Sequence, residues 1–296
     1  MQALKGSLVA LVTPMLPNGD VDYQCLESLI DWHIGEGTNG IVSVGTTGES
    51  ATLNIKEHID VIRHTVKYAN KRIPIIAGTG ANSTQEAIDL TEESRIIGAD
   101  YALLVTPYYN KPNQEGLLAH FSAIAENASI KQILYNVPAR TACDLKPQTV
   151  KILSCYENII GIKEAVDDMS RIEELIKIST DQNNNFIVFS GDDPTFTKAL
   201  ELGAHGVISV AANVIPKSIA KICSLSLEAN FEDAILLDKK YKNLYRLLFV
   251  ESNPIPVKWI LTKMGLIKNS IRLPLIEFNG NFHEKTMSEL KNLGLL

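Results

Sequence analysis

Short apolar runs, separated by amphipathic stretches, recur along the chain from Ser7 to Val210. Most of these runs are continuously apolar rather than alternating, which is typical of parallel strands that are covered by helices. Their starts lie 20 to 33 residues apart, which leaves room for one helix between successive strands. The eight predicted strands are Ser7–Val12, Gly40–Gly45, Ile73–Thr79, Tyr101–Thr106, Gln132–Asn136, Ile159–Lys163, Phe186–Ser190 and Gly206–Val210.

Helical patterns fill the intervals between the predicted strands. Examples are Tyr23–Gly35, Ile55–Asn70 and Thr84–Ile97. Helix start signals are the capping-box pairs Asn54/Glu57 and Ser83/Glu86, and Asp193 placed before Pro194. Eight strand–helix repeats predict an α/β fold of the (β/α)8 TIM-barrel form. A doubly wound sheet is the alternative, but the nearly even spacing and the lack of an obvious edge strand favour the closed barrel.

The C-terminal part of the chain shows no further strand-like repeat after Asn213. The stretches Phe231–Phe249 and Pro256–Met264 have helical patterns instead. We therefore predict a barrel with the catalytic site over residues 1–225 and an appended C-terminal helical region over residues 226–296. No Gly/Ser-rich or Pro-rich linker separates the two, so independent motion is not implied.

Composition and charge exclude several classes of protein. The net charge of −6, from 28 Lys and Arg against 34 Asp and Glu among 296 residues, argues against nucleic-acid binding. No apolar run approaches the ~18 residues of a membrane span. The stretch Gly6–Val12 after Lys5 is too short for a signal peptide and lacks a cleavage pattern. We therefore expect a cytoplasmic protein that binds neither nucleic acid nor membrane.

Metal and nucleotide motifs are missing from the sequence. The four cysteines have no metal-binding spacing, and the six histidines form neither an HxH nor an HExxH motif. Gly78-Thr79-Gly80 follows a predicted strand but lacks the third glycine of a dinucleotide fingerprint. We expect reduced cysteines, no metal and no bound cofactor.

Lys163 is the lysine at the carboxyl ends of the predicted strands, where barrel active sites lie. By strand alternation it shares a face with Gly161, whose missing side chain would leave room for a ligand. Burial would lower its pKa, which matters because only ~0.04 % of an ordinary lysine is neutral amine at pH 7. A Schiff-base nucleophile needs that neutral form. The alternative is a lysine that extends to solvent or pairs with Glu164, although Glu164 is expected to face the helices.

Three neighbouring features at the same end of the barrel each allow two interpretations. Tyr135 ends the preceding strand, where its hydroxyl could reach a substrate bonded to the lysine or simply line the barrel. Arg140 is either a bidentate clamp for a carboxylate or a solvated loop residue. The loop 45–50 offers N–H groups and hydroxyls to a carboxylate, or serves only to start a helix.

Several segments resemble the dihydrodipicolinate synthase family, which belongs to the N-acetylneuraminate-lyase-like pyruvate aldolases. They contain the GxxGE, YxxP and strand-lysine elements of these aldolases, and the resemblance extends over essentially the whole chain. Thr46-Thr47 together with Arg140-Thr141 resemble the synthases rather than the neuraminate lyases. The segments are Gly45–Leu53, Thr106–Pro112, Tyr135–Pro138, Gly161–Ala165 and Asn253–Lys258.

The resemblance implies a class I aldolase-type lyase that condenses pyruvate with L-aspartate 4-semialdehyde in diaminopimelate and lysine synthesis. The covalent intermediate would form on Lys163 without another cofactor. Tyr135, Thr46 and Tyr109 would relay protons, with Tyr109 supplied by a neighbouring subunit of a homotetramer built from tight dimers. Substrate contacts are implied at Thr47 for the pyruvate carboxylate, at Arg140 for the semialdehyde carboxylate, and at the backbone of Gly191 and Ile208.

The resemblance also implies a pocket for L-lysine as a feedback effector at the dimer interface. Glu86 can accept from the ammonium group of the ligand, and Asn82 and Tyr108 can donate to its carboxylate. Sensitive members of the family carry histidine where Ile55 stands, and a lost hydrogen bond to a charged group costs ~1.5–3 kcal/mol. We therefore predict weakened, partial inhibition. The matching positions are Ser50, Ala51, Ile55, His58, Asn82, Glu86 and Tyr108.

Two other functions compete with this interpretation. Another pyruvate aldolase, acting on a sugar acid, would need hydroxyls that bind a polyol chain, whereas Arg140 suits a short acidic acceptor. A non-catalytic paralogue that kept the barrel for binding or assembly would be expected to lose Lys163 or Tyr135, and this chain has both.

Overall fold

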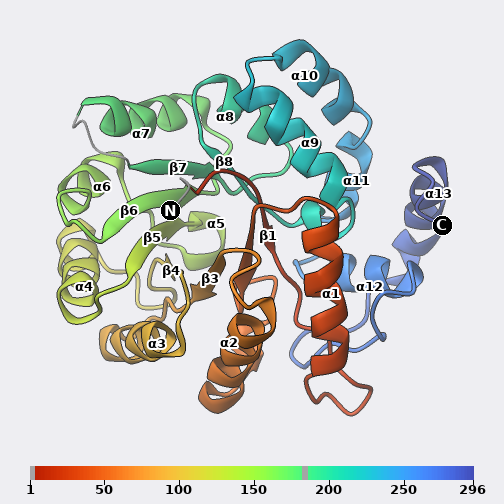
Figure 1. Cartoon of the computed structure of the whole chain (residues 1–296), viewed down its shortest axis with the longest axis horizontal. Helices are drawn as coiled ribbons and strands as arrows, with labels where there is room; N and C mark the ends of the chain where they lie inside the picture. The colour runs from red at the N-terminus through yellow and green to blue at the C-terminus, as the bar shows by residue number, and fades with distance from the viewer. Residues whose placement is uncertain (1–3, 182–185) are drawn as a thin grey trace.

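The computed structural model describes residues 4–181 and 186–296, and it shows a closed barrel of eight parallel strands (Figure 1). The strands follow one another around the barrel in chain order, and β1 closes the ring by pairing with β8. This confirms the predicted (β/α)8 barrel and rules out the doubly wound sheet. The strands are β1 (Gly6–Ala10), β2 (Gly40–Ser43), β3 (Ile75–Gly78), β4 (Tyr101–Val105), β5 (Lys131–Asn136), β6 (Ile159–Glu164), β7 (Ile187–Ser190) and β8 (Gly206–Ser209).

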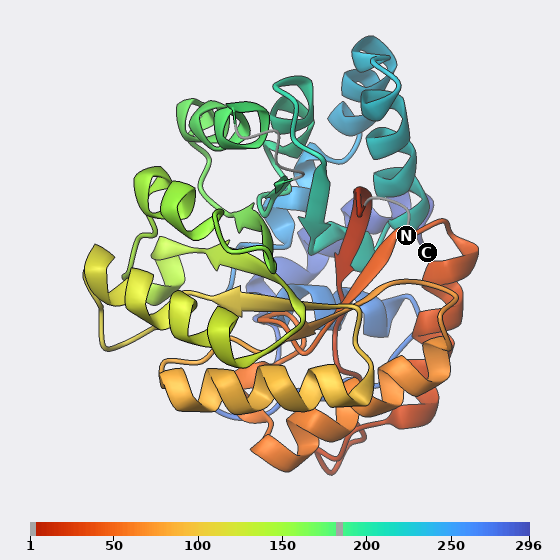
Figure 2. The same ribbon diagram turned by 60° about the vertical axis from the view of Figure 1, so that its left-hand side comes forward.

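Helices surround the barrel and continue beyond it. Figure 2 shows α2 to α4, in orange and yellow, side by side on the outside of the barrel. Within the described residues no helix is both long and apolar enough to cross a membrane. The helices are α1 (Tyr23–Gly35), α2 (Ile55–Ala69), α3 (Thr84–Ile97), α4 (Gln114–Asn127), α5 (Pro138–Thr141), α6 (Pro147–Leu153), α7 (Met169–Asp181), α8 (Phe196–Glu201), α9 (Pro216–Leu227), α10 (Phe231–Lys239), α11 (Lys242–Leu247), α12 (Ile255–Lys263) and α13 (His283–Asn292).

The predicted helix starts are confirmed at α2 and α3 but not at α8. Asn54 and Glu57 form both hydrogen bonds of the capping box at α2. At α8 the prediction is wrong, because the helix begins at Phe196 rather than at Pro194. Asp193 instead uses its side-chain Oδ2 to accept hydrogen bonds from two backbone N–H groups that follow β8. Its complete burial raises its pKa to about 6.

The predicted helix Phe231–Phe249 is two helices, α10 and α11. The chain turns between them, and the buried Asp238 in the last turn of α10 accepts hydrogen bonds from the hydroxyls of Thr197 and Tyr245. Tyr245 is fully buried, so the turn brings a large aromatic side chain of α11 into the core. The hydrophobic pattern continues across this break, which explains why one long helix was predicted.

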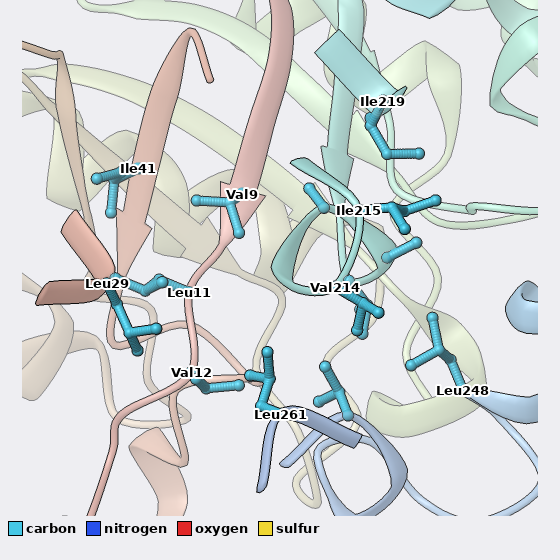
Figure 3. Packing of buried hydrophobic residues seen from close by; sticks show 14 of the residues in the cluster. Val9, Leu11, Val12, Leu29, Ile41, Val214, Ile215, Ile219, Leu248 and Leu261 are labelled. Carbon is cyan, nitrogen blue, oxygen red and sulfur yellow. The ribbon is translucent and has the colours of Figure 1, made fainter. Parts of the chain in front are cut away.

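Alternate strand residues pack into the barrel or against the helices. Leu8, Val42, Ile133 and Tyr135 belong to the cluster that fills the barrel interior. A larger cluster outside the strands includes Val9 of β1, and Figure 3 shows that Leu261 of α12 lies in this same cluster. The C-terminal helical region therefore shares a hydrophobic core with the first elements of the barrel.

Gly161 lies in β6 on the same face as Lys163, but it does not leave room for a ligand. A Cβ atom at this position would overlap the carbonyl oxygen of Ile187 in β7. The expectation of ligand space at Gly161 is therefore wrong, because the glycine permits close approach of two strand backbones.

Candidate active site

A cavity of about 220 Å³ opens at the carboxyl ends of the strands. The ends of β5 and β6, and the loops after β2, β5 and β7, provide its walls. The structure thus gathers, from segments far apart in the sequence, a lysine, a tyrosine, an arginine and two threonines. The predicted site residues that line this cavity are Thr46, Thr47, Tyr135, Arg140, Lys163 and Gly191.

Lys163 lies at the end of β6 with its side chain inside the cavity. Only 6 % of the residue is exposed, and its Nζ lies 4.3 Å from the centre of the Tyr135 ring. The two residues are direct register partners across β5 and β6. Glu164 points to the opposite side of the sheet and pairs with Arg171 at 2.8 Å. The alternative of a lysine paired with Glu164 is therefore wrong, as the strand alternation indicated.

Gly191 follows β7 and lies against the Lys163 side chain. A Cβ atom at this position would come within 2.7 Å of Lys163 Cε and 2.9 Å of the Ala165 Cβ. Glycine is therefore needed here so that the lysine can lie along this wall of the cavity.

The loop after β2 presents Thr46 and Thr47 to the cavity through two unusual backbone conformations. Val44 and Glu49, on either side of the threonines, have φ angles of 55° and 59°. The Thr47 hydroxyl accepts a hydrogen bond of 3.0 Å from Asn253 Nδ2, which comes from the C-terminal region. Sequence reasoning assigned no site role to Asn253, although it belongs to the Asn253–Lys258 segment that carries part of the resemblance.

A buried ion pair fixes the end of the same loop. Glu49 pairs with Lys258 of α12, and the two side chains are 0 % and 4 % exposed. Burial lowers the pKa of Lys258. The second carboxylate oxygen of Glu49 accepts a hydrogen bond of 3.2 Å from the Arg272 N–H. The loop with Thr46 and Thr47 is therefore held by residues that follow it by more than 200 positions in the sequence.

Arg140 lies in α5 beside the cavity and is an exposed residue. Its Nη2 donates a hydrogen bond of 3.2 Å to the carbonyl oxygen of Asn253. A guanidinium carries five N–H donors, so this contact orients the group and leaves donors for a carboxylate. Arg140 also lines a second cavity, described below.

Two predicted site residues lie elsewhere. Ile208 is fully buried in the barrel interior, and Val210 lines the cavity near it. Tyr109 is 89 % exposed, with a φ of 74°, on the loop after β4. Its neighbour Tyr108 is 41 % exposed and lines the second cavity. Two adjacent tyrosines are therefore exposed on this loop.

The second cavity, of about 260 Å³, shares Thr46 and Arg140 with the first. His58 lies in its wall with Nε2 donating to the Gly78 carbonyl oxygen at 2.7 Å, and burial lowers the pKa of this histidine. Among the predicted effector residues, Ile55 is 63 % exposed and does not line it, nor does Asn82. Those that line it are Ser50, Ala51, His58, Glu86 and Tyr108.

Metal-binding groups are not found in the part of the chain that the structure describes. Neither residues 4–181 nor 186–296 contain a group of three or more His, Cys, Asp or Glu side chains suited to a metal ion. The polar groups that line the first cavity are an amine, a phenol, hydroxyls, a guanidinium, the Asn253 amide and the carboxylate of Asp192, and the amine and phenol suit covalent and acid–base chemistry.

Known proteins of similar sequence point to one family. The model of the Dihydrodipicolinate synthetase family matches residues 3–293. A 4-hydroxy-tetrahydrodipicolinate synthase from Stutzerimonas stutzeri (strain A1501) is 52 % identical over 294 residues, which cover 99 % of both sequences.

Solved structures show the same similarity. A chloride-inhibited dihydrodipicolinate synthase from Acinetobacter baumannii, complexed with pyruvate, has a TM-score of 0.96 at 50 % identity and covers 99 % of this chain and 100 % of its own. A dihydrodipicolinate synthase from Cyanidioschyzon merolae with lysine bound has a TM-score of 0.95 at 35 % identity and covers 100 % of both chains. The chain therefore belongs to the dihydrodipicolinate synthetase family.

Proposed function

We propose that this chain condenses pyruvate with L-aspartate 4-semialdehyde to form 4-hydroxy-tetrahydrodipicolinate, through a Schiff base on Lys163. The observation that carries the proposal is the buried Lys163 amine beside Tyr135, in the same cavity as Arg140. The pyruvate complex of the Acinetobacter relative supports pyruvate as the first substrate.

The reaction follows from what an amine can do to a ketone. Neutral Lys163 attacks the pyruvate ketone carbon, water leaves, and a protonated imine forms. This imine accepts the electron pair left when a C3 proton is removed, which gives an enamine. The enamine carbon adds to the aldehyde of the second substrate. The amino group of that substrate then attacks the imine carbon, closes the ring and releases Lys163.

Proton transfer is assigned to Tyr135, supported by Thr46 and by Tyr109 from a neighbouring subunit. The Tyr135 ring lies against the lysine amine and lines the same cavity, which supports its hydroxyl as the group that moves protons there. Tyr109 is the exposed member of the three, and a second copy of the chain would have to bring it to this cavity. We therefore propose a homotetramer built from two tight dimers, active in the cytoplasm.

Carboxylate binding is assigned to Thr47 for pyruvate and to Arg140 for the semialdehyde. Asn253 connects these two groups, because its side chain donates to Thr47 and its carbonyl oxygen accepts from Arg140. A backbone contact to substrate is proposed at Gly191, which lines the cavity, and not at Ile208, which is fully buried outside it. The shared core and the buried pair of Glu49 and Lys258 support treating residues 1–225 and 226–296 as one working unit.

A coupled assay with pyruvate and L-aspartate 4-semialdehyde tests the substrates, and Arg140→Ala tests the clamp. We expect Arg140→Ala to weaken use of the semialdehyde far more than imine formation with pyruvate. The loss of a hydrogen-bonded charged partner corresponds to about 1.5–3 kcal/mol, or roughly a tenfold to hundredfold fall in kcat/KM for the semialdehyde. Equal damage to both steps would show that Arg140 does not bind the second substrate.

L-lysine is proposed as an effector that binds the second cavity. The lysine complex of the Cyanidioschyzon relative supports this ligand, and Glu86 offers a carboxylate in the cavity wall. Ile55 lies outside this cavity and is exposed, so it would reach the effector only across a dimer interface, and its apolar side chain would offer no hydrogen bond there; we therefore expect partial, weakened inhibition. Titration with lysine at saturating pyruvate measures it, and Ile55→His is expected to tighten inhibition. Tight, complete inhibition of the unmodified chain would show that position 55 is irrelevant.

A further inference from the structure

Four polar side chains form a cluster on the outer face of β5 and β6, behind the first cavity. This β5–β6 cluster consists of Asn136, Asp144, Glu164 and Arg171. Arg171 joins the two carboxylates, with Nε 2.8 Å from Glu164 Oε2 and Nη2 2.8 Å from Asp144 Oδ1. Asn136 Nδ2 also donates to both, at 3.0 Å to each. The Glu164 side chain is completely buried, so this cluster supplies its hydrogen bonds.

The cluster lies directly behind the reacting groups. Asn136 and Glu164 are register partners across β5 and β6, and so are Tyr135 and Lys163, one residue earlier in each strand. The first pair faces the helices and the second faces the cavity. The hydrogen bond between Asn136 and Glu164 therefore joins β5 and β6 directly next to Tyr135 and Lys163. It thereby helps to fix the distance between those two residues.

Hydrogen bonds also join residues of the cluster to the two neighbouring loops. Leu145 follows the helix that carries Arg140, and its N–H donates to Asn136 Oδ1 at 2.9 Å while its carbonyl oxygen accepts from Arg171 Nη2. The carbonyl oxygen of Glu164 accepts from the Gly191 N–H at 2.7 Å. The side chains of the cluster thus connect β5, β6 and the segment that follows the Arg140 helix, whereas the loop after β7 is joined to Glu164 through the backbone alone.

We infer that Glu164 and Arg171 are positioning residues for the proposed reaction: they hold Lys163 against Tyr135 and fix the loop that carries Arg140. The energetics favour this role over simple stabilisation. Burial raises the pKa of Glu164 to about 7 even though Arg171 opposes the shift, so the site makes the charged carboxylate costly. Apolar residues of similar size would pack at the positions of Glu164 and Arg171 without the free-energy cost of burying a charge. They would not make directional hydrogen bonds that hold the strands and loops in one arrangement.

Arg171→Met tests the inference, with kcat and the KM for pyruvate measured separately. Methionine keeps much of the volume but removes the fork that joins Glu164, Asp144 and Leu145. A displacement of about 1 Å at reacting groups costs on the order of 100-fold in rate, so we expect kcat to fall by about that factor. The KM for pyruvate should change little. Arg171→Lys should recover only part of the rate, because an ammonium cannot make the same forked contacts.

Glu164→Gln provides a second variant in case Arg171→Met fails to fold. Glutamine has the same shape, but one of its two terminal atoms becomes a donor that faces the donors of Arg171 and Asn136. We expect a loss of roughly tenfold in kcat, smaller than for Arg171→Met, because one acceptor is kept.

Asp238→Asn is the matched control. Asp238 is also a buried carboxylate, with Lys242 Nζ at 2.6 Å and the hydroxyls of Thr197 and Tyr245 at 2.9 and 3.0 Å, but it lines neither cavity. It should lower stability and leave kcat unchanged in assays below its melting temperature.

The outcomes separate this inference from the proposed function on which it rests. If the unmodified chain forms no pyruvate adduct on Lys163, the proposed function fails and the inference fails with it. If it forms the adduct and the folded variants of Arg171 or Glu164 keep kcat within about twofold, the inference alone is overturned. An equal loss of kcat in Asp238→Asn would overturn it as well, since the effect would then be general destabilisation.

Discussion

Lys258→Met is expected to lower the free energy of unfolding by about 3–5 kcal/mol, the cost of leaving a buried charge without its partner. The variant leaves the carboxylate of Glu49, which is 0 % exposed, with the Arg272 N–H at 3.2 Å as its hydrogen-bond donor. Methionine resembles the lysine side chain in length and flexibility, so the loss reports the missing charge rather than a cavity.

Two further variants separate the charge effect from other causes. The double variant Glu49→Gln/Lys258→Met removes both charges and should recover most of the loss, because replacing a whole buried pair is often neutral. Arg95→Met breaks an ion pair with Glu92 on α3, where the side chains are 42 % and 36 % exposed. This surface variant should cost far less than Lys258→Met, because water and salt screen an exposed pair.

Urea denaturation measures all three variants, followed by far-UV circular dichroism and by tryptophan fluorescence, to which Trp259 next to Lys258 contributes. The two signals must coincide for a single free energy of unfolding to be defined. The reasoning is refuted if Lys258→Met costs no more than Arg95→Met, or if the double variant is no more stable than the single one.

Three other predictions concern the catalytic face and its support. Gly191→Ala places a Cβ 2.7 Å from Lys163 Cε and should lower kcat on the order of 100-fold. The control is Gly35→Ala, whose added Cβ meets no atom within 4 Å, and it should keep full activity in the same assay. Burial raises the pKa of Glu164 from 4.5 to about 7. Between pH 7 and pH 4.5 the Glu164 carboxylate is therefore protonated in the native state but not in the unfolded state, and the native state gains stability as the pH falls. The free energy of unfolding of the unmodified chain, relative to Glu164→Gln, should therefore decrease by up to about 3 kcal/mol from pH 5 to pH 8 in urea titrations, and a flat difference would contradict the assignment. Tyr109→Phe should slow turnover at least tenfold without changing the sedimentation coefficient, and unchanged turnover would remove Tyr109 from the proton relay.

Local pattern was sufficient to predict the barrel and the face on which Lys163 lies. Parallel strands buried on both sides appear as continuous apolar runs, so all eight strands were identified, with ends that differ by no more than two residues from the structure. The alternation along β6 also predicted that Lys163 and Glu164 would point in opposite directions, as their separate partners confirm.

Contacts between distant segments could not be predicted in the same way. Asn253 reaches Thr47 across 206 positions, and Lys258 reaches Glu49 across 209. Those contacts depend on how the C-terminal helices dock on the barrel, which no local pattern encodes. Gly161 was misinterpreted for a related reason, because the sequence does not show that the backbone of β7 fills the space beside it.

Reductive trapping of pyruvate decides whether Lys163 carries the reaction. The chain is incubated with pyruvate and borohydride, digested, and mapped by mass spectrometry, with Lys163→Ala and Lys258→Met as parallel samples because both lysines are buried. We expect one pyruvate-derived adduct, on Lys163, in the unmodified chain and in folded Lys258→Met, and none in Lys163→Ala. An adduct on another lysine, or no adduct at all, would contradict the Schiff-base mechanism.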